Sequence, residues 1–394
     1  MSDPVRQDVV VVGGGVAGLM ATIAFGRAGY TVTCLDPAPP GGSTDLRSTA
    51  FLMPAVRMME EAGLWSELAP HAAELRVMRL CDSGGADNIV REQVDFAAAE
   101  IGEERFGWNV PNAVLRPAMI ALAESIEGVT LRMGVGARGL LARSSAARVT
   151  ADDGTRYDAA LMVAADGRNS PMREALGIDT RTFRYGQKAM VFHVSHPAPH
   201  HGVSTELHRT GGPFTLVPLP DGEDGTHRSA VVWMETGPNV ARLMALDDAA
   251  LNAEATARSC GVLGPLTLAG KRIAWPIISQ EARALTGPHS ALIAEAAHVM
   301  PPIGAQGLNT SFADIRALLD AAGREALGSE QMLDLYAQAR SRDIAIRERG
   351  VAALNLAAFA EAQPLRDLRR AGLHTLASLA PLRRTAIRRG MGLA

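Results

Sequence analysis

Three glycines near the amino terminus have the spacing of a turn that binds a dinucleotide. They are Gly13, Gly15 and Gly18, and they follow four consecutive valines. The first glycine permits a tight turn, the second lets the backbone approach a pyrophosphate, and the third lets a helix pack closely on a strand. Asp36, eighteen residues after Gly18, is placed to bind ribose hydroxyls. These residues predict a bound dinucleotide, and the acid favours FAD or NAD over NADP.

The elements around this turn are those that such a site requires. The four valines at 9–12 are typical of a strand buried on both faces in a parallel sheet. Residues 19–28 predict a helix that ends at Gly29, and residues 30–35 predict a second strand that ends at Asp36. The alternative is a glycine-rich turn without a ligand. We favour the dinucleotide because the βαβ unit is complete and carries the acid.

Composition places the chain among ordinary globular proteins. Its 394 residues are too many for one compact core. A composition of 47% hydrophobic and 21% charged residues excludes a disordered chain and a coiled coil. A net charge of −3 argues against nucleic-acid binding. The three cysteines form no CxxC pair, so redox chemistry would need a cofactor. We recognise no signal peptide or transmembrane span, and we expect a cytoplasmic protein.

Two further motifs follow apolar strands far from the glycine turn. Residues 165–173 read ADGRNSPMR, and residues 294–309 read AEAAHVMPPIGAQGLN. Together with the glycine turn, they resemble the single-component flavin hydroxylases of the para-hydroxybenzoate hydroxylase type. Within that group, residues 45–50 (DLRSTA) and 300–309 most resemble the ubiquinone-biosynthesis hydroxylases. The resemblance extends over about residues 8–350.

The resemblance and the local patterns together predict the fold. We expect an α/β plus α+β protein, with a Rossmann-like FAD-binding domain built on a parallel sheet, an inserted antiparallel-sheet substrate domain and a helical C-terminus. The predicted FAD-binding domain is discontinuous and comprises residues 1–75, 101–183 and 277–330. The predicted substrate domain comprises 76–100 and 184–276, and the C-terminal helical region comprises 331–394.

The resemblance also implies roles for individual residues. The pyrophosphate of FAD and its adenosine ribose would be held by Gly13, Gly15, Gly18 and Asp36. The phosphates and the ribityl chain would be reached by Arg47, Arg116, Asp166, Gly167 and Glu295. The isoalloxazine ring would lie against Gly304, Gln306, Gly307, Leu308 and Asn309. A rigid, dry wall facing the flavin would be formed by Pro301, Pro302, Ile303 and Gly304. The substrate would be faced across the sheet by Tyr185, Gln187 and His193, which could equally be ordinary sheet residues.

Three positions in the third motif stand out. Ala294 and Glu295 replace the usual Gly-Asp pair, and Ser311 lies where we expect a small residue, usually glycine. His298 either orients the flavin loop or is satisfied by a main-chain carbonyl. The histidines of the middle region have no recognisable metal-ligand spacing, so we predict no metal.

The chemistry implied by the resemblance is hydroxylation of a phenolic ring. FAD would be reduced by NAD(P)H, which binds transiently because the chain has a single glycine fingerprint, and O2 would be the second co-substrate. The implied substrate is a polyprenylated phenol of ubiquinone biosynthesis. One alternative is a flavin hydroxylase of a small soluble aromatic. Another is an FAD-poor, non-catalytic accessory protein that binds lipid or protein partners.

Residues 364–394 form a basic segment. They contain seven arginines and one aspartate, a net charge of +6, with leucines at near-helical spacing. A basic amphipathic helix can lie on an anionic membrane surface, which would place the protein peripherally on the inner face of the membrane. The alternatives are a helix packed on its own domain and a helix that binds a protein partner.

Overall fold

A computed structural model describes residues 3–40, 45, 47–85, 87–143, 145–360 and 362–392. Leu46 of the 45–50 motif therefore lies outside the described residues, and so do residues 393–394 of the basic segment.

A parallel sheet occupies the amino-terminal half of the structure. Its strands run in the order β19 (Ser290–Leu292), β11 (Arg156–Ala164), β1 (Val5–Val12), β2 (Val32–Asp36) and β8 (Val129–Met133), all mutually parallel. The antiparallel strands at its margins are β18 (Thr286–Gly287), β10 (Ala147–Ala151) and β9 (Ala137–Ala142). Val9 to Val11 are fully buried, as a strand covered on both faces requires. The carboxyl ends of β1, β2 and β11 meet at one edge, where ligands of such sheets bind.

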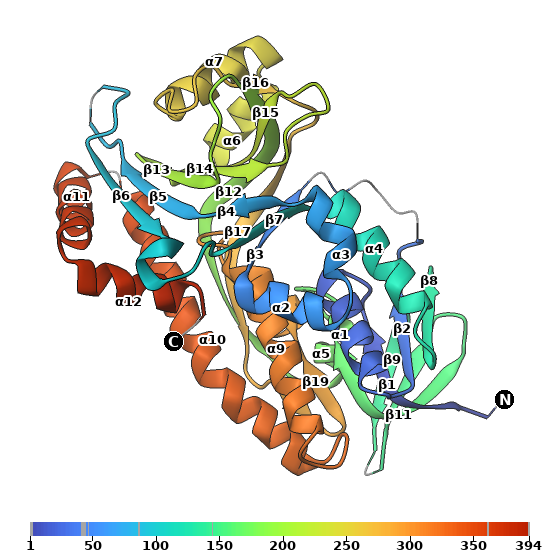
Figure 1. Cartoon of the computed structure of the whole chain (residues 1–394). Coiled ribbons are helices and arrows are strands. Elements are labelled where there is room, and N and C mark those ends of the chain that lie inside the picture. Colours follow the sequence, from blue (N-terminus) through green and yellow to red (C-terminus); the bar gives the residue numbers. More distant parts are fainter. Residues whose placement is uncertain are drawn as a thin grey trace.

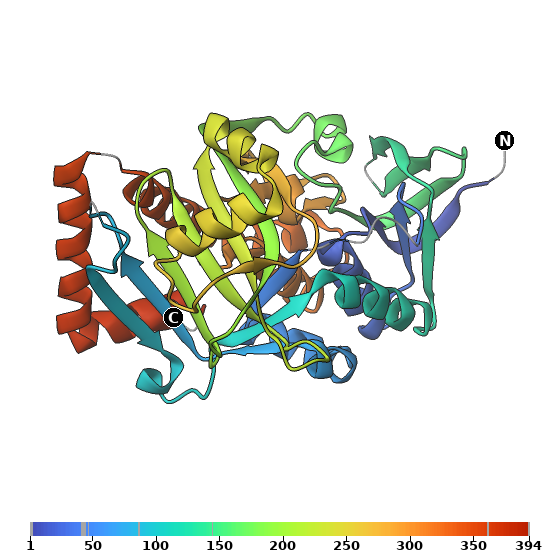
Figure 2. The ribbon, with the colours of Figure 1, turned by 90° about the horizontal axis from the view of Figure 1, so that it is seen from above.

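A second, mainly antiparallel sheet lies beside the first (Figure 1). Its strand order is β20 (His298–Val299), β17 (Ile273–Ala282), β12 (Thr180–His196), β15 (His227–Thr236), β14 (Pro213–Leu219), β13 (Val203–His208), β5 (Val77–Asp82) and β6 (Glu92–Ala97). The short β16 (Thr267–Leu268) also pairs with β12. The helices α6 (Gly237–Ala245) and α7 (Asp248–Arg258) lie across one face of this sheet (Figure 2). Because β20 pairs with β17, the sheet adjoins the loop that follows residue 299.

Shorter elements join the two sheets. A three-stranded sheet consists of β3 (Ser48–Leu52), β7 (Gly107–Pro111) and β4 (Ala73–Leu75). The helices near it are α1 (Val16–Arg27), α2 (Met53–Glu61), α3 (Trp65–Leu68) and α4 (Asn112–Glu124), with the 3-10 turns η1 (Ala69–His71) and η2 (Ala98–Ile101). The second and third motifs contribute the short helices α5 (Pro171–Ala175) and α8 (Ala294–Ala297).

The carboxyl-terminal part is helical. It consists of α9 (Gln306–Ala322), α10 (Glu330–Phe359), α11 (Gln363–Ser378) and α12 (Ala380–Gly390). The last two helices lie beside β5 and β6, at the opposite end of the molecule from the N-terminus (Figures 1 and 2). Among the described residues, no helix combines the length and the apolar character needed to cross a bilayer.

The predicted fold class is confirmed, and three local expectations differ from the structure. The first helix begins at Val16 rather than 19, because Gly15 already serves as its N-cap. The sequence of residues 295–305 predicts a loop, whereas the structure has most of α8 and the strand β20 in this stretch, and β20 pairs with β17. β12 extends over seventeen residues, so the predicted boundary at 183/184 falls inside a strand. The division into three domains stays a prediction.

Candidate functional site

The glycine turn joins β1 to α1 as the sequence predicted. Gly13 has a φ of +106°, and a Cβ there would overlap the carbonyl of Ala165. A Cβ at Gly18 would overlap the carbonyl of Gly13, so this glycine permits the close approach of helix and strand. At Gly15, by contrast, a Cβ would have no neighbour within 4 Å. The backbone at Gly15 therefore faces open space at the amino end of α1, where free N–H groups attract anions.

That open space is a hollow of about 550 Å³. Five predicted site residues line it together: Gly13, Gly15, Asp36, Asp166 and Gly167. The hollow is of a size typical of cofactor sites. A bare glycine backbone, a helix amino terminus and an acid at the end of β2 fit the pyrophosphate and ribose of a dinucleotide. Other lining residues come from β9 and β10 and their flanks, which the sequence analysis did not single out: Gly136, Ala137, Arg138 and Asp152.

Asp36 and Arg116 hold the rim of this hollow. The Asp36 carboxylate accepts hydrogen bonds from the N–H of Gly14 and, at 2.7 Å, from that of Ala38. Arg116, on α4, donates to the carbonyls of Gly14 (3.4 Å) and Pro40 (3.1 Å). A carboxylate oxygen has more than one acceptor position, so Asp36 can still receive a ribose hydroxyl.

Arg47 lies between the parallel sheet and the antiparallel sheet. Its guanidinium forms two bonds with Asp45, at 2.8 and 2.6 Å, and lies 5.7 Å from the ring centre of Trp275 on β17. Asn112 donates to the same carboxylate at 2.9 Å. Although partial burial opposes ionisation, the bonds from Arg47 and Asn112 lower the pKa of Asp45 to about 2. Arg47 is thus held by a permanent negative charge.

The second and third motifs are joined by two arginines. Arg168 forms an exposed ion pair with Glu295 at 3.3 Å. Arg173 is buried and donates to the carbonyls of Ala296 (2.9 Å) and Arg168 (3.0 Å). The Asp166 carboxyl accepts from the Ser170 hydroxyl and from the N–H of Met172, which caps α5, and burial raises the pKa of Asp166. Glu295 is therefore placed close to the segment that lines the hollow.

The third motif ends in a loop with an unusual backbone. Gly304 has a φ of +63° and Ala305 a φ of +57°, and α9 begins at the next residue. Pro301 and Ile303 are buried, whereas Pro302 is exposed. Asn309 fixes the first turn of α9, because its side chain donates to the carbonyl of Ala50 and accepts from the N–H of Leu52 on β3, both at 2.8 Å. These two bonds hold the first turn of α9, which includes Gly307 and Leu308, beside β3.

The three predicted substrate residues do not come together. The Tyr185 hydroxyl is 2.8 Å from the hydroxyl of Ser279. Gln187 is buried and is bonded on both sides, accepting from Asn355 at 2.9 Å and donating to the carbonyl of Gly211 at 3.2 Å. His193 lies six residues further along β12, about 20 Å away at ~3.3 Å per residue.

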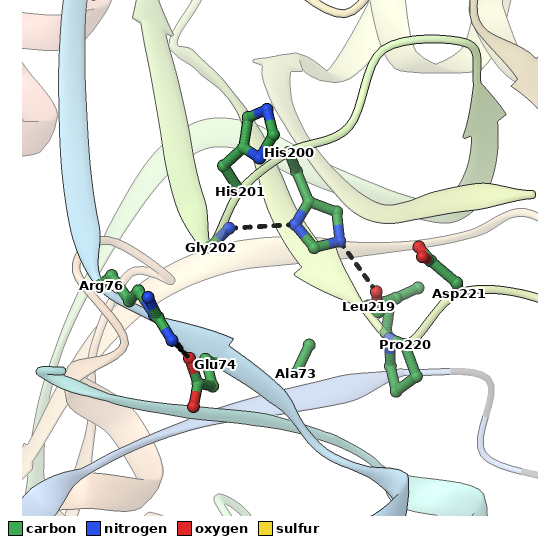
Figure 3. Close-up of a pocket in the computed structure, with 9 residues that line it drawn as sticks. All are labelled: Ala73, Glu74, Arg76, His200, His201, Gly202, Leu219, Pro220 and Asp221. Atoms are coloured by element: carbon green, nitrogen blue, oxygen red, sulfur yellow. Dashed lines mark hydrogen bonds and ion pairs between the residues drawn. The ribbon is translucent and has the colours of Figure 1, made fainter. Parts of the chain in front are cut away.

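A second hollow of about 380 Å³ lies between β4 with the adjacent Arg76, the turn between β12 and β13, and the end of β14. None of the predicted site residues lines it. Figure 3 shows the His200 ring between Gly202 and Leu219. The ring accepts a hydrogen bond from the N–H of Gly202 and donates one to the carbonyl of Leu219. The Arg76 guanidinium is already paired with Glu74. His200, Arg76 and Glu74 are therefore already paired within the protein.

Sequence reasoning missed a buried carboxylate behind the third motif. Asp314 is fully buried on α9 and accepts from His298 at 2.6 Å, from Arg340 at 2.8 Å and from the N–H of Ala294 at 3.1 Å. Its position on the apolar face of the helix was the available signal, because a buried acid requires partners. His298 is therefore bonded to a carboxylate, not to a main-chain carbonyl.

Over most of its length, the chain is similar to known proteins. A family model described as "FAD binding domain" matches residues 6–346. Ubiquinone hydroxylase UbiL of Rhodospirillum rubrum is 30% identical, over 98% of this chain and 89% of that protein. The 3-demethoxyubiquinol 3-hydroxylase of Escherichia coli is 26% identical, over 98% of each chain.

Solved structures agree at the level of the fold. The crystal structure of p-nitrophenol 4-monooxygenase PnpA from Pseudomonas putida has a TM-score of 0.81 at 17% identity, with 99% of each chain covered. PqsL of Pseudomonas aeruginosa, in complex with 2-aminobenzoylacetate, has a TM-score of 0.75 at 21% identity, over 94% of this chain and all of that one. The match over residues 6–346, together with the hollow at the glycine turn, leads to one conclusion: the chain belongs to this FAD-binding family and is an FAD-dependent monooxygenase.

Proposed function

We propose that this protein hydroxylates the aromatic ring of a prenylated phenol in ubiquinone biosynthesis, with NAD(P)H and O2 as co-substrates. The names of the two relatives, a ubiquinone hydroxylase and a 3-demethoxyubiquinol 3-hydroxylase, support this substrate class. The observation that carries the proposal is the hollow in which the backbone of Gly15 lies open beside Asp36 and Asp166.

The positions of the motifs support one arrangement of FAD. The pyrophosphate would be held by Gly13, Gly15 and Gly18, and the adenosine ribose by Asp36. The ribityl chain would be held by Arg47 and Glu295. The ring would be held by Gly304, Gln306, Gly307, Leu308 and Asn309, around the amino end of α9.

Bound FAD supplies the activation of O2, and the protein contributes its surroundings. The N–H groups in the first turn of α9 would stabilise negative charge on a flavin ring held there. Pro301 and Ile303 are buried just before this helix and would exclude water from the reacting groups. We assign no protein side chain as acid or base.

The test of this proposal begins with cofactor content. Purified protein should be yellow, or should become so when reconstituted with FAD. Consumption of NADH or NADPH should then be measured with a panel of phenols, each with and without a prenyl tail. Stimulation by the prenylated phenols, with a hydroxylated product by mass analysis, supports the proposal. Equal stimulation by tail-free phenols favours a hydroxylase of small soluble aromatics, and a colourless protein that cannot be reconstituted favours an accessory role.

We also propose contact with a membrane surface through residues 364–392. Four leucines of α11 and α12 and their junction are about half exposed or more: Leu365, Leu368, Leu379 and Leu382. Three nearby arginines are exposed and form no ion pair with any described residue: Arg384, Arg388 and Arg389. The inner sides of both helices pack on the protein itself, through Leu373, Ile387 and the pair Arg369–Asp82 at 2.7 Å. Exposed leucines flanked by unpaired arginines match an anionic lipid surface.

Sedimentation with vesicles tests this contact. Wild-type protein should pellet with vesicles that contain anionic lipid and should stay in solution with neutral vesicles. Replacing Leu365, Leu368, Leu379 and Leu382 by Ser should abolish pelleting. Leu141→Ser is the matched control, because Leu141 is equally exposed but lies on β9. Pelleting that survives the four replacements would contradict the proposed surface.

A further inference from the structure

Three charged residues follow one face of α10. Arg340, Asp343 and Arg347 are spaced three and four residues apart, so their side chains are neighbours. Arg340 donates to Asp343 at 2.6 Å, and Arg347 donates to it at 2.9 and 3.0 Å. Partial burial opposes the charge, but the bonds from Arg347 and Arg340 hold the pKa of Asp343 below its ordinary value. We call this set the α10 ladder.

The upper end of the α10 ladder reaches the start of the third motif. Arg340 donates at 2.8 Å to one oxygen of Asp314, whose other oxygen accepts from the N–H of Ala294 and from His298. Burial alone would raise the pKa of Asp314, but His298 and Arg340 hold this pKa below its ordinary value. Ala294 has a φ of +54°, a strained conformation for a residue with a Cβ. The carboxylate thus holds a backbone that would not adopt this shape by itself.

The lower end of the α10 ladder reaches the end of the same loop. Arg347 donates at 2.7 Å to the side-chain oxygen of Gln306, the first residue of α9. The amide nitrogen of Gln306 donates at 2.9 Å to the carbonyl of Gly304 and at 3.4 Å to that of Gly390, at the end of α12. Ala305, which lies between Gly304 and Gln306, is a second residue with a Cβ in the left-handed conformation.

We infer that the α10 ladder is a positioning device that holds both ends of the loop 294–306 in the conformation that receives the flavin. The inference rests on the placement of the ring under the proposed function. Strained residues persist only where their surroundings hold them. Here the strain lies at both ends of the loop. Arg340 reaches the first end through the Asp314 carboxylate, and Arg347 bonds directly to Gln306 at the other end. The ladder residues act through the loop and touch neither FAD nor substrate.

Asp343→Asn tests the inference, because it removes the charge shared by both arginines while keeping the side chain's shape. Glu254→Gln is the matched control: Glu254 forms a two-bond pair with Arg242, but on α6 and α7, away from the loop. The FAD dissociation constant should rise about tenfold in Asp343→Asn, as expected for loss of a charge-assisted bond, and should not change in Glu254→Gln. Amide hydrogen exchange at residues 294–309 of the apoprotein should also become faster in Asp343→Asn alone.

A second variant guards against a simple folding defect. Arg347→Gln breaks only the lower end and leaves the pair of Arg340 with Asp314 in place, so its faster exchange should be confined to residues near 304–309. Arg347→Lys should restore part of the FAD affinity, because a lysine can still donate one bond. Unchanged exchange and unchanged FAD affinity in Asp343→Asn would overturn the inference. Failure of the wild-type protein to bind FAD would instead overturn the proposed placement, and the exchange of the apoprotein would still decide whether the ladder holds the loop.

Discussion

At the scale of the residue, the third motif is held against local strain. Ala294 adopts a left-handed conformation that costs about 1–2 kcal/mol for a residue with a Cβ. The sequence resemblance led us to expect glycine at this position, and the observed φ of +54° gives the physical reason for that preference. Ser311 is accommodated differently, because its hydroxyl donates to the carbonyl of Gly307 at 3.1 Å within α9.

We therefore expect Ala294→Gly to stabilise the protein. Relief of the left-handed strain outweighs the greater chain entropy of glycine in the unfolded state, so the free energy of unfolding should rise by up to about 1 kcal/mol. Urea denaturation of the apoprotein measures this change. Ala296→Gly, within the short helix α8, is the control and should destabilise the protein instead.

Two glycines of the fingerprint should respond differently to the same substitution. Gly15→Val places its side chain in open space, so the fold should survive while the FAD dissociation constant rises more than tenfold. Gly18→Val would drive its side chain into the carbonyl of Gly13, so the protein should unfold or lose most of its stability. Circular dichroism and FAD titration separate the two effects. Unchanged FAD content in Gly15→Val would falsify the assignment of the glycine turn.

At the scale of the element, the turn between β12 and β13 is sensitive to acid. His196 accepts from the Ser229 hydroxyl and donates to the carbonyl of Ala198, and the His227 ring stacks on it at 6.3 Å. His200 accepts from the N–H of Gly202, a bond that protonation of the ring would destroy. Burial lowers the pKa of His196 and of His200 below the ordinary value of 6.5.

Acid should therefore destabilise the protein through this turn. Below pH 6.5 these histidines bind protons in the unfolded chain more readily than in the folded protein. The free energy of unfolding present at pH 7 is therefore lost as the pH falls toward 5. The slope is at most about 1.4 kcal/mol per pH unit for each histidine. Chemical denaturation at pH 7, 6 and 5 measures it. His200→Gln should reduce the slope, whereas replacing the exposed His71 by Gln should leave it unchanged.

Local patterns predicted elements better than they predicted partners. The glycine turn and the acid at the end of β2 belong to one short βαβ segment, and both are predicted from the sequence. The contact of Asp314 with Arg340 joins residues 26 positions apart, and that of Arg47 with Trp275 joins residues more than 200 apart. No periodicity encodes such pairs. The apolar run 189–194 predicts only the second half of β12, because the first half, with Arg181 and Arg184 exposed, is not apolar.

At the scale of the whole molecule, FAD should act as part of the structure. The hollow and the loop 294–306 draw on segments from residue 12 to residue 306, so a bound dinucleotide would connect regions that are distant in the chain. A ligand that binds only the folded state at 100 times its dissociation constant stabilises it by about 2.7 kcal/mol. Thermal unfolding should thus shift upward on adding FAD. The shift should vanish in Gly15→Val and shrink in Asp343→Asn.

The last helix also shares a bond with the catalytic end of the molecule. Ile387 of α12 and Met391, just after it, are buried in one apolar cluster with Leu52, and the carbonyl of Gly390 accepts from the amide nitrogen of Gln306. Under the membrane contact proposed above, a displacement of α12 would reach the first residue of α9 through the bond between Gln306 and Gly390. Binding at a lipid surface and the shape of the proposed flavin loop would then be coupled through a single glutamine side chain.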